Sequence, residues 1–159
     1  MRKLKVAFNG IFDRIQLGMG TAGGAETVLY VVNSSMQLSE QSLVATFDLA
    51  NAFNQRKRME IARALYADER TSIVWRTFSV AYGQENVAIV YDADGKCAKR
   101  IRLCEGVEQG DLLAQFAFDL SMQRVYERST DNSNVITSVA VHDDFTGVGT
   151  VQSILGTSD

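Results

Sequence analysis

The sequence contains no proline, two cysteines and a single histidine among its 159 residues. A structural zinc site needs four cysteine, histidine or carboxylate ligands in a close cluster, and these three side chains form no such group. A pairing of Cys97 with Cys104 across a hairpin is one alternative for the two cysteines. Because nothing else accompanies them, we expect two free thiols rather than a metal site.

Long apolar runs are also missing, which argues against a bilayer-spanning helix. The basic start of the chain, at Arg2, Lys3 and Lys5, is not followed by the apolar core of a secretory signal. We therefore expect an intracellular protein, of the cytoplasm or nucleus, that is neither secreted nor bound to membranes. A hydrophobic content of 46% and a charged content of 22% are typical of one globular domain with its own core.

Positive charge is scarce for a protein that would bind nucleic acid, since the formal net charge is -3. The basic residues are nevertheless clustered, at Arg56, Lys57, Arg58 and Arg63 and again at Lys99, Arg100 and Arg102. The first cluster is either a set of phosphate contacts or a solvated helix face. Bound divalent cations would offset local negative charge, so the acidic balance does not exclude a nucleic-acid enzyme.

The apolar pattern predicts four helices, at 25–38, 55–66, 71–82 and 112–127, with Asn54 and Asp111 as caps of the second and fourth. Strands are expected at 42–48, 87–91, 98–103, 135–141 and 145–149, with short candidates at 6–8 and 11–12. Asp94 and Gly95 predict a hairpin turn. Because strands outnumber those of simple βαβ alternation, we predict an α+β fold, an antiparallel sheet with helices packed on one face.

Acidic residues stand where two apolar runs stop. Asp48 ends one strand-like segment, Asp143 and Asp144 end another, and a glycine-punctuated loop at 105–111 lies between them. An ionised carboxylate near apolar surroundings is costly unless a cation or donors meet it, and magnesium prefers oxygen ligands. The order and spacing suggest a nucleotidyl-transfer site. The alternative is that Asp48 only terminates a strand and that Asp143 and Asp144 are a turn pair with local hydrogen bonds.

Three segments resemble the motifs of the reverse transcriptase palm domain, most closely that of non-long-terminal-repeat retrotransposons. The first, second and third palm motifs are matched by residues 47–54, 106–111 and 141–144. Residues 16–20 and 23–26 resemble a fingers-side segment found upstream in these elements. Each block alone is common, but three in the right order are fairly specific.

The resemblance implies a fragment of a right-hand polymerase. Residues 1–40 would be a fingers-side segment, 41–151 the antiparallel palm and 152–159 a short polar tail. The thumb and the early fingers residues of the family are not matched by any part of this sequence.

The implied activity is that of an RNA-directed DNA polymerase, with an RNA template, a DNA primer and deoxynucleoside triphosphates as partners. Two Mg²⁺ or Mn²⁺ ions assist such a transfer by activating the attacking oxygen and neutralising the leaving one. By resemblance, Asp48 and Asp143 would be catalytic and bind both ions, with Asp144 nearby in support. The backbone carbonyl of Leu49 would be a further metal ligand.

The resemblance also implies three nucleotide-binding residues: Phe53, Gln109 and Gly110. An aromatic ring at Phe53 would exclude a 2′-hydroxyl, which would lose its hydrogen bonds against the ring. Gly110 would allow close backbone approach and Gln109 would donate to or accept from the ligand. Taken alone, Phe53 is an ordinary core residue and the other two belong to a loop before a helix capped by Asp111.

The sequence departs from the family at three positions. Leu112 and Gln115 replace two prolines of the second motif, which loosens the start of the helix, and Val141 replaces an aromatic residue of the third. One alternative is therefore a degenerate, inactive palm fragment. Another is an RNA-binding α+β module, which needs exposed aromatic residues on central strands, where only Tyr91 qualifies. His142 fills the variable position of the third motif and is given no chemistry.

Overall fold

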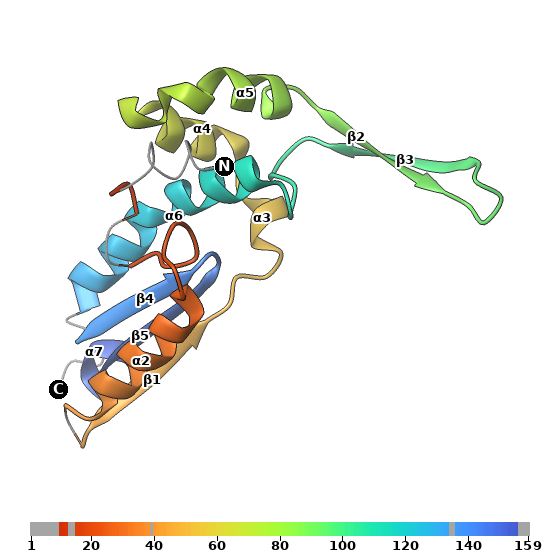
Figure 1. Cartoon of the computed structure of the whole chain (residues 1–159). Coiled ribbons are helices and arrows are strands. Elements are labelled where there is room, and N and C mark those ends of the chain that lie inside the picture. The colour runs from red at the N-terminus through yellow and green to blue at the C-terminus, as the bar shows by residue number, and fades with distance from the viewer. Residues whose placement is uncertain (1–9, 13–14, 39, 134–135, 156–159) are drawn as a thin grey trace.

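The computed structural model describes residues 10–12, 15–38, 40–133 and 136–155. Its elements, in chain order, are α2 (Gly24–Met36), β1 (Ser42–Phe47), α3 (Ala52–Gln55), α4 (Arg58–Tyr66), the 3₁₀ turn η1 (Glu69–Thr71), α5 (Ser72–Tyr82), β2 (Asn86–Tyr91), β3 (Cys97–Leu103), α6 (Leu112–Ser133), β4 (Thr137–Val141), β5 (Asp144–Thr150) and α7 (Val151–Leu155). Antiparallel strands combined with helices make this an α+β fold, as the sequence predicts (Figure 1).

The central strand of the main sheet is β5, which pairs antiparallel with β1 on one side and β4 on the other. The last residue of β1, Phe47, lies opposite Phe145. Val141 lies opposite Asp144 and closes the β4–β5 hairpin. Because these pairs are at the same end of the sheet, the chain that leaves β1 emerges beside the hairpin turn.

Helix α6 lies between α4 and the main sheet (Figure 1), and several of its residues belong to the hydrophobic core. Its residues Ala117 and Phe118 are 0% and 1% exposed. Phe53 of α3 stacks on Phe118, with 4.2 Å between the ring centroids. Helix α4 packs against α6 and buries Ile61 and Leu65 completely. Burial of each such large side chain contributes about 1.5–3 kcal/mol, so the core holds α3 firmly against α6.

Helices cover both faces of the main sheet. Tyr126 of α6 stacks on Phe145, with ring centroids 5.0 Å apart, so α6 lies on the face of Phe145. Side chains alternate along a strand, which turns Val148 to the other face, where α2 packs against the sheet (Figure 1). The expectation that helices pack on one face is therefore wrong for α2, because β5 has apolar side chains on both sides.

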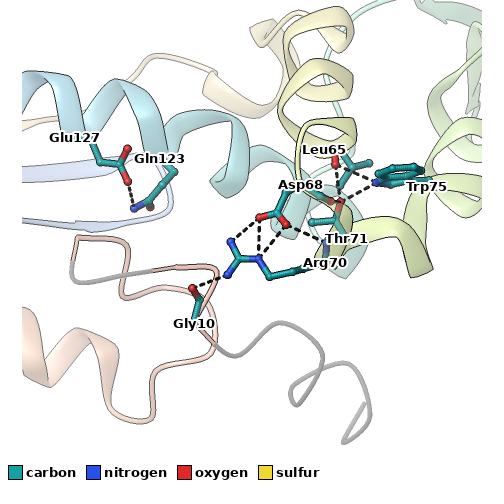
Figure 2. A network of polar contacts seen from close by, with 8 residues as sticks. All are labelled: Gly10, Leu65, Asp68, Arg70, Thr71, Trp75, Gln123 and Glu127. Carbon is teal, nitrogen blue, oxygen red and sulfur yellow. Dashed lines mark hydrogen bonds and ion pairs between the residues drawn. The ribbon is translucent and has the colours of Figure 1, made fainter.

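A polar network fastens η1 to the loop at Gly10 (Figure 2). Asp68 accepts from the backbone N–H of Arg70 at 3.0 Å and from its Nη2 at 2.6 Å. Arg70 Nη1 in turn donates to the carbonyl of Gly10 at 3.1 Å. Thr71 Oγ1 donates to the carbonyl of Leu65 at 2.5 Å. These bonds satisfy backbone groups where α4 ends and α5 begins.

Strands β2 and β3 form a separate two-stranded ribbon that projects from the rest of the molecule (Figure 1). Asp92 Oδ1 accepts from the N–H groups of Asp94 and Lys96, at 3.0 and 2.8 Å. Gly95 has a φ of +74°, which fits the Asp-Gly turn signal. Most of the ribbon's side chains are exposed on both faces, so it receives little support from the core.

The expected helix 55–66 is wrong at its start. It is two helices, α3 and α4, separated by Arg56 and Lys57 in extended conformation, and Asn54 lies inside α3 instead of capping a helix. The break has a long-range cause: the carbonyl of Arg56 accepts from the N–H of Gly106 at 3.1 Å.

Smaller differences concern the ends of the chain. Residues 11–12, expected as a strand, form a turn, and the supposed polar tail begins with helix α7. The candidate strand at 6–8 and residue 135 lie outside the described residues.

Cys97 and Cys104 are free and exposed, as expected. In the described part of the chain, no helix has the length and apolar character needed to cross a bilayer.

Candidate active site

The first and third motifs meet at one end of the main sheet. Asp48 follows β1 directly, and the turn between β4 and β5 consists of His142 and Asp143. A cleft of about 170 Å³ opens there, lined by Asp48, Leu49, Ala50, Asn51, Ala52, Phe53, Asn54, Gln109 and Asp143. Five of the residues predicted from the sequence thus line one cleft, among them one from the second motif.

The loop that follows Asp48 is shaped by Asn51. This residue has a φ of +54°, a conformation that asparagine tolerates better than most side chains. Its Oδ1 accepts from Asn54 Nδ2 at 2.6 Å, and the carbonyl of Leu49 accepts from the N–H of Ala52 at 3.2 Å. The tight turn brings the chain into α3 and lines the cleft with its backbone.

The second motif is docked on the first through backbone contacts. The N–H of Val107 donates to the carbonyl of Phe53 at 2.9 Å. Gly106 has a φ of +71°, and a Cβ at this position would lie 2.3 Å from the carbonyl oxygen of Asn54. Arg58 Nε donates to the carbonyl of Gly106 at 2.8 Å. This docking carries Gln109 to the rim of the cleft.

Gly110, by contrast, is exposed and is not among the residues that line the cleft. It has a φ of +94° and precedes Asp111, whose Oδ1 accepts from the N–H of Leu113 at 2.9 Å. The predicted cap of α6 is therefore present. Tyr82 donates its hydroxyl to Asp111 Oδ2 at 2.6 Å, and burial raises the pKa of Tyr82.

Phe53 is 7% exposed, and its ring stacks on Phe118. It therefore serves as a core residue and as part of the cleft wall at once. The two interpretations of this residue that the sequence left open are compatible in the structure.

The ring of His142 faces a buried carboxylate. Its Nδ1 lies 2.9 Å from Oδ2 of Asp119, which is 0% exposed, and its Nε2 lies 2.6 Å from Gln115 Nε2. The hydrogen bond with Asp119 raises the pKa of His142. Burial raises the pKa of Asp119. Sequence reasoning assigned no role to His142, because the partner of its ring is not apparent from sequence spacing.

Asp144 is the first residue of β5 and is exposed, outside the set that lines the cleft. Its charge still acts on this corner of the molecule. Burial raises the pKa of Tyr126, and the nearby carboxylates of Asp119, Asp143 and Asp144 raise it further. The hairpin turn is therefore a region of concentrated negative charge.

The oxygen atoms in the cleft suit a hard cation that takes only a few of its ligands from the protein. Among the described residues, no group of three or more histidine, cysteine, aspartate and glutamate side chains is placed to hold a metal ion. Asp48 and Asp143 provide two carboxylates in the cleft, and Leu49 provides a carbonyl. Magnesium usually takes one or two carboxylates and completes its shell with water and substrate phosphates. The residues present fit that pattern.

Two arginines of the basic cluster after the first motif have structural contacts. Arg56 donates to the hydroxyl and the carbonyl of Ser121, at 3.2 and 2.9 Å. Arg58 also donates to the carbonyl of Gln84 at 2.6 Å. Both arginines thus tie α3 and α4 to other elements. Sequence spacing could not separate these roles from phosphate contacts, because each partner is distant along the chain.

Comparison with known proteins gives a likeness in fold. No protein-family model matches the chain, and no curated protein matches it. A solved structure of telomerase from Candida tropicalis, in complex with the TWJ fragment of telomeric RNA, is similar with a TM-score of 0.61 and 12% sequence identity. The match covers 98% of this chain and 28% of the telomerase chain. At this identity the likeness shows that the chain shares the fold of part of a telomerase.

Proposed function

We propose that this chain is the palm of an RNA-directed DNA polymerase of the retroelement type, and that the cleft at Asp48 and Asp143 is its nucleotidyl-transfer site. The observation that carries the proposal is the cleft itself, which gathers residues from three motifs that are far apart in sequence. The likeness in fold to an RNA-bound telomerase supports it. On this proposal the partners are an RNA template, a DNA primer and deoxynucleoside triphosphates.

Two divalent ions, Mg²⁺ or Mn²⁺, would activate the primer hydroxyl and neutralise the leaving pyrophosphate when bound. Asp48 and Asp143 would hold them, with the carbonyl of Leu49 as a further ligand. Asp144 would add negative charge next to the cleft without lining it.

The remaining cleft residues would bind the incoming nucleotide. Gln109 has an amide that both donates and accepts, which suits recognition of a sugar or phosphate. Phe53 would form the wall that a 2′-hydroxyl cannot face without losing its hydrogen bonds. Gly110, next to the rim, would let a ligand approach the backbone.

Primer extension tests the proposal, with an RNA template, a labelled DNA primer and all four deoxynucleotides in Mg²⁺ or Mn²⁺. We expect Asp143→Asn to lower the extension rate by a factor of about 100 or more, since it removes a charge that supports the transition state. Asp94→Asn, the same change in the exposed turn of the β2–β3 ribbon, should extend like the wild type. Equal extension by the two variants would refute the proposal.

A second candidate is a palm that binds nucleic acid without catalysis. The specific observation in its favour is that, in the described part of the chain, only Asp48 and Asp143 bring carboxylates to the cleft. Fluorescence anisotropy with an RNA–DNA hybrid would show binding while the wild type fails to extend the primer. An RNA-binding sheet surface is disfavoured, because helices pack on both faces of the main sheet.

A further inference from the structure

The β4–β5 turn has an uncommon backbone for its sequence. Only His142 and Asp143 separate the paired residues Val141 and Asp144. Of the two turn residues, His142 alone has a positive φ, at +56°. This is the pattern of a type II′ turn, in which the first central residue is normally glycine. A histidine persists in such a conformation only when its surroundings hold it there.

The side chain of Gln16 holds both backbone polar groups of His142. Its Oε1 accepts from the N–H of His142 at 2.9 Å, and its Nε2 donates to the carbonyl of His142 at 3.1 Å. The hydroxyl of Tyr126 donates to the same carbonyl at 2.8 Å. A single carboxamide thus binds both the N–H and the carbonyl of the strained residue. Gln16 therefore stabilises the backbone conformation at position 142 and makes no use of the histidine side chain.

Gln16 is itself held in place. It is 1% exposed, and its Oε1 also accepts from the N–H of Gly18 at 2.9 Å. Its backbone forms a single parallel β-bridge with β4. The N–H of Leu17 donates to the carbonyl of Ala140, and the N–H of Ala140 donates to the carbonyl of Ile15, both at 2.7 Å. The carboxamide of Gln16 is therefore held in place by contacts other than those with His142.

The histidine ring does not line the cleft. Besides its contacts with Asp119 and Gln115, it packs on Gly18, where a Cβ would lie 2.7 Å from its Cε1. The next residue, Asp143, lines the cleft. Because Asp143 follows His142 directly, a change in the backbone conformation of His142 would shift the backbone from which the carboxylate of Asp143 extends.

We infer that Gln16 is a positioning residue for Asp143, acting through the backbone of His142. The inference depends on the proposed function in that Asp143 is taken as a metal ligand. It also gives a reason for the pairing of residues 15–17 with β4, because this pairing places the side chain of Gln16 at the turn of the third motif.

The first measurement is hydrogen exchange at single amides, which needs no metal. In Gln16→Leu, a change that keeps side-chain bulk and removes the hydrogen bonds, the His142 amide should exchange about tenfold faster or more than in the wild type. Thr71→Val loses a buried hydroxyl far from the turn. In this control the exchange rate of the His142 amide should change only as much as the free energy of global unfolding does. An unaltered His142 amide in Gln16→Leu would overturn the inference. Gln16→Asn, whose carboxamide is one methylene group too short to reach both backbone groups of His142, replaces Gln16→Leu if the latter does not fold.

The second measurement is Mn²⁺ binding by calorimetry in two backgrounds. Gln16→Leu should weaken Mn²⁺ binding by about tenfold or more, as loss of a supporting residue around a metal does. Glycine adopts positive φ without strain, so the loss should be smaller when Gln16→Leu is combined with His142→Gly than in the wild-type background. An equal loss in both backgrounds would mean that Gln16 acts only as a core residue.

The two proposals fail in different ways. If the wild type takes up no Mn²⁺, the proposed function is refuted, and exchange of the His142 amide alone decides whether Gln16 fixes the turn. If the wild type binds Mn²⁺ and Gln16→Leu binds it equally well, the positioning role is refuted and the proposed function stands.

Discussion

At the scale of single residues, Gly106 shows how closely the second motif approaches the first. It combines a positive φ with a backbone contact that leaves no room for a side chain. Gly106→Ala should therefore lower the free energy of unfolding by about 2 kcal/mol or more, because it adds both strain and a clash with a carbonyl that cannot swing aside. Denaturant unfolding measures this change.

Gly95 provides a matched control. Its φ of +74° is almost the same, but nothing lies within 4 Å of a Cβ placed there. Gly95→Ala should cost about 1 kcal/mol, from backbone strain alone. Equal losses for the two variants would show that Gly106 is needed only for its φ and that the close docking of the two motifs is wrong.

Asp68 supplies a residue-level test of pH dependence. Hydrogen bonds from Arg70 hold its pKa below the ordinary value. Because the folded-state pKa lies below the unfolded one, the charged group contributes stability that is fully present above the unfolded pKa and lost as the pH falls through the folded pKa. Asp68→Asn keeps the capping oxygen but loses the charge that faces Arg70, and should cost about 0.5 kcal/mol at neutral pH.

That difference should begin to shrink as the pH falls below about 4, the unfolded-state pKa, and should disappear once the folded wild-type carboxylate has also taken up a proton. Urea unfolding of both proteins at several pH values measures it. A difference that stays constant down to pH values well below this point would contradict the role of the ionised carboxylate.

At the scale of elements, local patterns predicted most helices and strands because their causes are local. The Asp94–Gly95 turn and the cap at Asp111 depend on neighbours a few residues away. The break at Arg56 depends on Gly106, and the setting of His142 depends on Gln16 and Asp119, all distant in sequence. Such contacts leave no periodic signal, so sequence reasoning missed them.

The β2–β3 ribbon should behave differently from the main sheet. It pairs only within itself, and its side chains are mostly exposed, whereas Val148 at the centre of β5 is 1% exposed. An isolated two-stranded ribbon has marginal stability. Its amides, such as that of Ile101, should therefore exchange through local opening about tenfold faster or more than those of β5.

Native-state hydrogen exchange measures these rates at low denaturant. If the amides of the ribbon and of β5 exchange with the same free energy and the same denaturant dependence, the ribbon would unfold only with the whole domain. That result would contradict its description as a weakly supported element.

At the scale of the whole molecule, the fold brings together residues that the sequence separates widely. Asp48, Gln109 and Asp143 come from different parts of the chain and line one cleft. The sequence predicted these three, since each belongs to a recognisable motif. It could not predict that Asp144 and Gly110 would lie outside the cleft, because one step along a strand or loop changes the direction of a side chain.

The account therefore depends on Asp48 and Asp143 serving one cation site. Calorimetric titration of Mn²⁺ into the wild type, Asp48→Asn, Asp143→Asn and the control Asp94→Asn measures this directly. We predict that each cleft variant binds Mn²⁺ at least about tenfold more weakly, while the control matches the wild type. Indistinguishable affinities for all four proteins would contradict the central claim.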